Sequence, residues 1–292
     1  SIAGSVIRKV GSAVCVGSSM FANLGMITRI VQNIRFMKIN VSDELSTAFG
    51  SWSTDFFSWD IPQKLSSLSE SEALPEVFAR YEMDSRFLVN YWATMMQLVI
   101  GILLFVGFNL LKACLKGVMH QKSFASLMLN YLVLAASNFA IIQIYGCLDD
   151  IVFYGLIDLR FSKFTSSFSS ISSLAAIIFL LAGALIFMLH IWILCEHRSL
   201  KKLANKEALE RFLNKFEPLQ ILYQDFKDTA MIKQSFFALL IVRSVFSSLI
   251  MALLSEKPLL QAILLMILSV SALSLLIFKG PYKELYSELT QY

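Results

Sequence analysis

Long uncharged runs of apolar residues dominate the pattern of the chain. Residues 87–111, 123–148, 164–195 and 258–278 each contain no Asp, Glu, Lys or Arg. A helix needs about 20 mainly apolar residues to cross the hydrocarbon core of a bilayer. The runs therefore predict four membrane spans. We expect the third span to cover residues 167–195, because its run opens with a serine-rich stretch suited to the membrane interface.

Two further segments have a weaker pattern of the same kind. Residues 234–255 are apolar but include Arg243, and residues 10–28 are uncharged and rich in Gly, Ser and Ala. Small residues of this kind suit a helix that packs closely against other helices. We extend that helix to residue 38, which gives a predicted span over 10–38. The sequence thus predicts an all-α polytopic bundle with six spanning helices.

The composition supports the membrane class and excludes a soluble enzyme. Hydrophobic residues make up 57% of the chain and charged residues only 16%, whereas soluble domains carry about a quarter charged residues. The four cysteines are far apart, so they suggest neither a zinc site nor a disulfide framework. The sequence contains no common hydrolase, phosphate-binding or dinucleotide-binding motif. We therefore expect no catalytic residues, cofactor, metal or nucleic-acid partner.

The charges of the connecting segments predict the orientation. Residues 112–122 carry three lysines and no acid, and residues 197–233 carry eight basic residues against five acidic ones. Residues 39–86 instead carry nine acidic residues against three basic ones, and 149–163 begin with two aspartates. Basic loops are favoured on the cytoplasmic side. We therefore expect both termini in the cytoplasm and residues 39–86 outside or in a lumen.

The predicted outer loop, 39–86, contains features of its own. Asn40 opens a glycosylation sequon, which agrees with an outer position. Aromatic residues next to a span suit the membrane interface, so a cap over the bundle is one interpretation. The other is a docking surface for a ligand or partner. The aromatic residues concerned are Trp52, Phe56, Phe57 and Trp59.

Residues 197–233 predict a cytoplasmic amphipathic helix that Pro218 ends. Apolar residues recur there at steps of three and four, with basic residues on the other faces. Such a helix is expected to contact anionic lipid headgroups, or alternatively to couple movements of two parts of the bundle. The candidate headgroup contacts are Lys201, Lys202, Lys206, Arg211 and Lys215.

Polar side chains at membrane depth are functional candidates, because burying them costs free energy. The candidates are Arg243, His190, Gln261, Asn33 and Arg35. For Arg243, a structural pairing with a carbonyl or with headgroups competes with a gating or lipid-binding role. His190 has a structural interpretation of the same kind. The absence of Asp and Glu from 87–148, 164–195 and 234–255 argues against a proton-coupled pump.

Short motifs near both ends resemble a known family. They are Leu222-Tyr223, Arg243-Ser244-Val245-Phe246, Pro258 with Gln261, Phe278-Lys279-Gly280-Pro281-Tyr282-Lys283, Gln32-Asn33 and Phe56-Phe57-Ser58-Trp59-Asp60-Ile61-Pro62. Together they resemble the multi-pass C-terminal region of ciliate surface proteins that carry a TRP-like, or polycystin-like, channel domain. The sequence departs from that family's pattern in having a single arginine, Arg243, where the family has two. The resemblance implies a channel-like or receptor-like membrane module, with a large extracellular domain upstream as a partner.

Three functions remain open from the sequence. The first is a channel module in a homo- or hetero-oligomer, with a pore lined by serines of the last two helices: Ser247, Ser248, Ser269, Ser271 and Ser274. Only Glu256 and Lys257 separate those two spans, too few for a re-entrant selectivity filter. The second is a non-conducting anchor or signalling module of a surface assembly, and the third is a lipid-handling protein. In each case we expect a protein of the plasma or ciliary membrane.

Overall fold

The computed structural model describes residues 74–79, 83–115, 124–164, 166–203, 206–216, 219, 222, 231 and 235–279. Within these ranges the chain is almost entirely helical and contains no strand. The predicted all-α class is therefore confirmed. The expected first span, 10–38, lies outside the described residues.

The described residues contain eight helices. They are α4 (Glu76–Ala79), α5 (Phe87–Leu115), α6 (Phe124–Gly146), α7 (Leu148–Phe161), α8 (Ser167–Lys202), α9 (Lys206–Lys215), α11 (Phe236–Leu253) and α12 (Pro258–Lys279). Local signals set several ends: the Ser166 hydroxyl accepts a hydrogen bond from Ser169 N at the start of α8, and Pro258 opens α12.

Among the residues that the structure describes, five helices are long and apolar enough to cross a membrane. One of them runs from Met128 to Phe161, through both α6 and α7. The backbone stays bonded across the junction, because Cys147 N donates to Gln143 O and Ile151 N donates to Cys147 O. The five candidates together approximate the expected number of spans and confirm a polytopic helical bundle.

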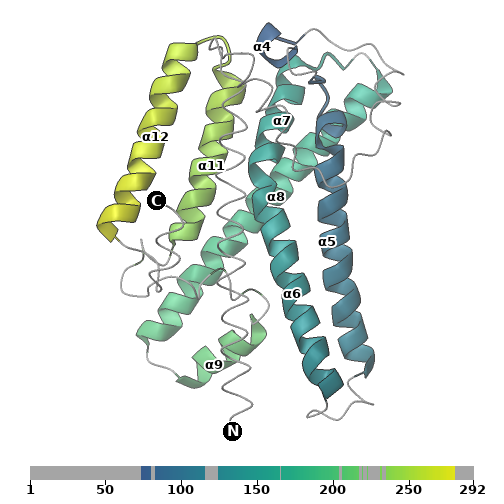
Figure 1. Ribbon diagram of the computed structural model, residues 1–292, viewed down its shortest axis with the longest axis vertical. Helices are drawn as coiled ribbons and strands as arrows, with labels where there is room; N and C mark the ends of the chain where they lie inside the picture. Colours follow the sequence, from purple (N-terminus) through teal and green to yellow (C-terminus); the bar gives the residue numbers. More distant parts are fainter. Residues whose placement is uncertain are drawn as a thin grey trace.

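The helices connect two ends of the molecule (Figure 1). The start of α5, the end of α7, the start of α8 and the α11–α12 turn lie at one end, with α4. The end of α5, the start of α6 and α9 lie at the other. α8 crosses the bundle obliquely between these ends, and α7 lies between α8 and α11.

Glycines allow α7 and α8 to approach closely. A Cβ on Gly183 of α8 would lie 2.9 Å from Leu148 Cδ2, and a Cβ on Gly155 of α7 would lie 3.3 Å from Leu180 Cδ1. A leucine of each helix thus packs against a glycine of the other helix. This reciprocal packing fixes the crossing of α7 and α8, because no side chain on either glycine separates the backbones.

Two expectations about connections are wrong. Residues 149–163, expected as a loop, form most of α7, because their apolar side chains fill positions facing α8 and α11. Residues 197–202, expected in a separate amphipathic helix, continue α8, so that only Lys206–Lys215 forms α9. The helical backbone of α8 continues through the charged residues at its C-terminal end.

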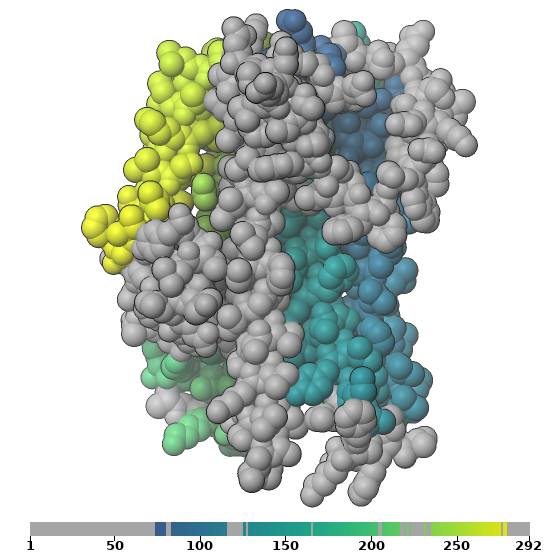
Figure 2. All heavy atoms as spheres, viewed as in Figure 1, coloured from purple at the N-terminus to yellow at the C-terminus, as the bar shows by residue number. Residues whose placement is uncertain are grey.

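Apolar side chains cover the outer faces of α5, α8 and α12. Leu103 is 64% exposed, Leu185 is 62% exposed and Met266 is 61% exposed. Figure 2 shows α12 at one edge of the molecule. Exposed apolar surface of this extent suits contact with lipid rather than water. The chain is an integral membrane protein in contact with the bilayer.

Candidate functional site

Two buried aspartates lie on opposite sides of α7. Asp149 and Asp158 are separated by nine residues, which places them about 180° apart around a helix of 3.6 residues per turn. Arg160 is eleven residues from Asp149 and therefore lies about 20° from it, on the same side. One side of α7 thus carries Asp149 and Arg160 toward α11, while Asp158 faces α5 and α8.

Asp158 joins three helices. Its Oδ2 accepts hydrogen bonds from Phe87 N at 2.7 Å and Ser172 Oγ at 2.6 Å, and its Oδ1 accepts one from Ser173 Oγ at 2.5 Å. The side chain is fully buried. A carboxylate has only acceptor oxygens, so three donors suit it. A negative group is also favourable at the start of α5, where the helix dipole is positive and the backbone N–H groups have no partner within the helix.

The serine-rich opening of α8 therefore has a structural role. Ser169, Ser172 and Ser173 are buried, although the sequence suggested an interfacial stretch. Ser172 also accepts a hydrogen bond from Leu88 N at 3.1 Å, so it bridges Asp158 and the first turn of α5. The hydroxyls of Ser172 and Ser173 face α7 because they supply donors that the buried carboxylate needs.

On the other side of α7, Asp149 bonds to α11. Its Oδ2 accepts a hydrogen bond from Ser244 Oγ at 3.1 Å, and its Oδ1 accepts one from Asp150 N at 3.0 Å. Both Asp149 and Ser244 are buried. Because Asp149 lies in the first turn of α7, its charge is favourable at that helix start.

Arg160 binds the C-terminal end of α11. Its Nη1 donates to the carbonyl oxygens of Ala252 at 2.9 Å and Leu253 at 3.0 Å, and its Nη2 lies 3.8 Å from Glu256 Oε1. The last carbonyls of a helix have no partner within it, so the guanidinium caps α11. Met251 and Ala252 also pack with Phe153 and Ile157 of α7 in a small apolar cluster. α7 is thus fixed to α11 at two points with apolar packing between them.

These contacts define a polar seam on α7, composed of Asp149, Asp158 and Arg160 with their partners. It connects the four-helix unit α5–α8 to the α11–α12 hairpin. The seam joins these helices through hydrogen bonds, and its described side chains form no paired groups suited to catalysis. In the residues that the structure describes, no group of three or more His, Cys, Asp or Glu side chains could hold a metal ion.

The positions of the two seam aspartates overturn one inference drawn from the sequence. The absence of acids from the predicted spans was an argument against a proton-coupled pump. Asp149 and Asp158 are buried in a helix that qualifies as part of a span, so that argument no longer holds.

His190 lies away from the seam, in an aromatic cluster. It is fully buried on α8, with ring centroids 5.4 Å from Tyr145, 6.4 Å from Phe187 and 5.9 Å from Phe237. These rings come from α6, α8 and α11. The surroundings suit a side chain that fills the core where the three helices meet.

Arg243 and Gln261 lie at different levels of the α11–α12 hairpin. Arg243 is partly buried, and its Nη2 lies 3.5 Å from Ser269 Oγ of α12. Gln261 is fully buried, and its Nε2 lies 3.5 Å from Met251 O, beside the carbonyls that Arg160 binds. The structure thus does not bring Arg243, His190 and Gln261 together into one site.

The expected pore serines divide into two groups. Ser247 and Ser248 of α11 are buried inside the protomer, so they do not face a pore there. Ser269 and Ser271 of α12 are exposed and Ser274 is half-buried, and the hydroxyls of Ser271 and Ser274 donate to Leu268 O and Val270 O within their own helix. A conducting path along this hairpin would therefore use α12.

The remaining sequence candidates are only partly described. The five basic residues expected at lipid headgroups, Lys201, Lys202, Lys206, Arg211 and Lys215, are all exposed at the end of α8 or on α9. Seven candidates lie outside the described residues: Asn33, Arg35, Asn40, Trp52, Phe56, Phe57 and Trp59.

The seam residues were missed because the two aspartates were interpreted as a loop signal. A different signal was present. Residues 148–161 contain no proline, and their apolar positions leave Asp149 and Asp158 on opposite faces of an uninterrupted helix. The partners on α8 and α11 come from distant parts of the chain, and no spacing in the sequence indicates them.

Comparison with protein families gives one match. The family model described as transient receptor potential (TRP) ion channel matches residues 37–291. No curated protein and no solved structure matches the chain. The family match covers every helix defined above.

Proposed function

The chain belongs to the transient receptor potential (TRP) ion channel family, and from this premise we propose that it conducts ions under the control of its four-helix unit. It is a membrane module of the TRP-like channel class, which is not a class of enzymes. In this proposal the α11–α12 hairpin forms the conducting path, the four-helix unit responds to the stimulus, and α7 links the two. The observation that carries the proposal is the seam on α7. One face of α7 bonds to α5 and α8, and the other face bonds to α11.

The seam supports coupling because its contacts are specific and those of Asp149 and Asp158 are buried. Hydrogen bonds to Asp158 relate α7 to the starts of α5 and α8. Contacts of Asp149 and Arg160 connect the same helix to the middle and to the C-terminal end of α11. A displacement of α5 or α8 must therefore either move α11 or break polar contacts in a low-dielectric environment, which is costly. Coupling of this kind travels through packed elements with two arrangements.

The exposed face of α12 supports an oligomeric pore. α12 packs against α11, and its exposed side chains include Ser269 and Ser271. A pore between copies of the chain would bring such faces around one axis, with hydroxyls available to a passing ion. We infer a homo- or hetero-oligomer for this reason.

A non-conducting anchor or signalling module is the second candidate. α11 ends at Leu253 and α12 begins at Pro258, and Lys257 N donates to Leu254 O in the turn between them. This turn is too short to enter the membrane again as a selectivity filter. The short turn favours an anchor of a surface assembly over a tetrameric pore with such a filter.

The proposal includes an orientation and a membrane. We infer cytoplasmic termini, residues 39–86 on the outer side and a position in the plasma or ciliary membrane. Enzymatic removal of N-linked glycan should then increase the gel mobility of the native chain but leave the mobility of Asn40→Gln unchanged. A native chain without glycan on Asn40 contradicts the predicted outer position.

Recording from planar bilayers tests conduction. The full chain, purified and reconstituted, should give currents that protein-free vesicles do not give. Ser269→Cys on the exposed face of α12 should make the current sensitive to a charged thiol reagent, whereas Ser248→Cys, which is buried, should not. No current from the native chain under any voltage, stretch or calcium condition would overturn the channel proposal and favour the anchor.

A further inference from the structure

Toward the end of α8 the exposed side chains change from apolar to basic. Trp192, which is 49% exposed, is the last of the large apolar side chains that cover the outer face of α8. The exposed Lys201 and Lys202 follow after nine residues, a rise of about 13 Å along the helix. A tryptophan at the edge of an apolar face followed by lysines is the order found where a span leaves the hydrocarbon.

The residues of α9 are arranged by charge around the helix. At 100° per residue, the apolar residues Leu209, Phe212 and Leu213 fall on one side. Lys206 falls at one border of that side, and Lys215 at the other. The two acidic residues, Glu207 and Glu210, lie between the basic ones, at the centre of the polar side. Basic residues at the borders of an apolar face allow their long side chains to reach headgroups beside the helix.

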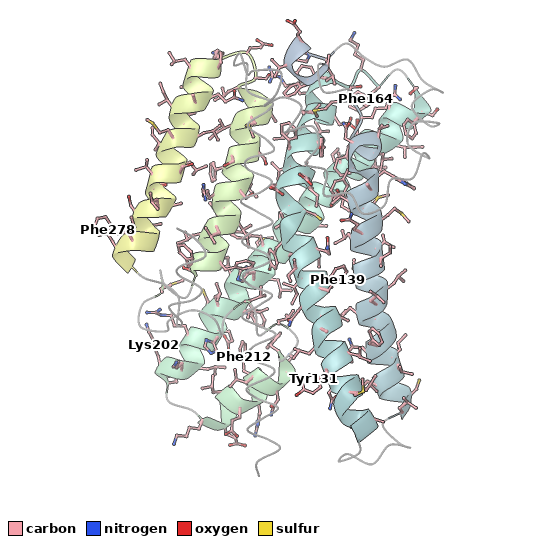
Figure 3. The ribbon with its side chains drawn as sticks, in the orientation of Figure 1. Tyr131, Phe139, Phe164, Lys202, Phe212 and Phe278 are labelled. Carbon is pink, nitrogen blue, oxygen red and sulfur yellow. The ribbon has the colours of Figure 1, made fainter. Side chains whose placement is uncertain are left out.

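α9 is held against the end of α8 by aromatic contacts. Phe212 is buried, with its ring centroid 6.0 Å from that of His197 and 4.8 Å from that of Phe216. The Phe216 ring lies 5.8 Å from that of Trp192, which belongs to the apolar face of α8. Figure 3 shows Phe212 and Lys202 near this end of the molecule. The packing fixes α9 at the level where α8 changes from apolar to basic.

Not all basic groups of α9 are available to bind an external anion. Arg211 pairs with Glu207, and the Lys215 ammonium lies 5.4 Å from the centre of the Phe216 ring. Lys202 and Lys206 are exposed on either side of the α8–α9 connection, and no ion pair between either of them and another described residue is present. These two ammonium groups are thus the best placed to meet an external anion.

We propose that the end of α8 together with α9 forms a surface for the headgroups of anionic phospholipids, with Lys202 and Lys206 as its principal contacts. The charge is complementary to anionic headgroups, and the neighbouring apolar and aromatic side chains place it at the depth of those headgroups. Lysines beside a negatively charged leaflet gain electrostatic attraction that other lipids do not provide. An acidic soluble protein would have no need of the adjoining apolar face.

The proposal is tested on the full chain in nanodiscs of phosphatidylcholine and phosphatidylserine in equal amounts. The phosphatidylserine that stays bound on transfer to detergent is counted by native mass spectrometry. Lys202→Gln with Lys206→Gln should lower the retained phosphatidylserine roughly 25-fold, since each lysine near the surface contributes about a fivefold preference and the two factors multiply. Lys202→Arg with Lys206→Arg should retain the native amount.

A matched control separates local from general charge effects. Lys163 and Lys257 are exposed at the opposite end of the bundle, so Lys163→Gln with Lys257→Gln should leave retention unchanged. Equal losses in the two double variants, or no loss in either, would overturn the proposal. The readout needs no ion current, so the lipid surface and the channel proposal can fail separately. An unchanged thermal unfolding midpoint verifies that the variants are folded.

Discussion

Asp149 and Asp158 lie on opposite sides of α7, and each bonds to a different part of the bundle. Asp149 accepts from Ser244 of α11, whereas Asp158 accepts from Phe87 N of α5 and from two serines of α8. One helix therefore contacts both parts through side chains that can be changed independently. Substitutions at the two positions should have separable effects.

Removal of the Asp158 carboxylate should destabilise the bundle strongly. Asp158→Ala leaves two buried hydroxyls and one backbone N–H without their acceptor, and we expect a loss of about 3 kcal/mol in the free energy of unfolding. Asp158→Asn keeps one acceptor oxygen and should cost about 1 kcal/mol. Unfolding in a denaturing detergent, followed by circular dichroism, measures both. Equal stabilities of the two variants would show that the hydrogen bonds to Asp158 do not hold the three helices together.

The contact between Asp149 and Ser244 should appear as a coupling free energy. In a double-mutant cycle with Asp149→Asn and Ser244→Ala, we expect about 1 kcal/mol of coupling in unfolding. The cycle of Asp149→Asn with Ser173→Ala provides the control, because Ser173 bonds to Asp158 on the far side of α7. Equal coupling in the two cycles would contradict the separation of the two faces.

Arg160 should stabilise the end of α11 more than its ion pair suggests. Arg160→Gln removes donors from two terminal carbonyls and should cost about 1 kcal/mol, with faster hydrogen exchange in the α11–α12 turn. Glu256→Gln serves as the comparison, because Glu256 is 71% exposed and such surface pairs contribute little. If both variants exchange at the native rate, Arg160 does not cap α11.

The crossing of α7 and α8 should tolerate no large side chain at Gly183. Gly183→Val would drive side-chain atoms into Leu148 and should cost about 2 kcal/mol through overpacking. Gly107→Val should be close to neutral, because a Cβ on Gly107 meets nothing within 4 Å. Leu148→Ala should restore part of the stability of Gly183→Val. A Gly183→Val protein as stable as Gly107→Val would show that the helices do not cross as closely as described.

The sequence predicted the helical membrane class because each span carries its signal locally. Twenty uncharged apolar residues have few alternatives to a helix in lipid. The seam was not predictable in the same way, since Asp158 looks like a loop residue until Ser172, Ser173 and the start of α5 are placed beside it. The interpretation of α9 depended on spacing alone and missed that Phe212 packs against the end of α8.

The polar candidate residues of the spans could likewise be predicted from the sequence, whereas their partners could not. Arg243, His190 and Gln261 were selected because polar groups in spans are costly. The structure places His190 in an aromatic cluster and Gln261 beside the last carbonyls of α11, so the two side chains have different surroundings. Residues of this kind can be found from the sequence, but their partners cannot, because these lie on helices far along the chain.

In the proposed function, α7 transmits a response from the four-helix unit to a conducting α11–α12 hairpin. Single-channel recording of the native chain and of Asp149→Asn in planar bilayers measures this transmission. We expect Asp149→Asn to change the open probability by about tenfold, which corresponds to about 1.4 kcal/mol of lost coupling, and to leave the unitary current unchanged. A changed unitary current at native open probability, or a native chain that carries no current, would contradict it.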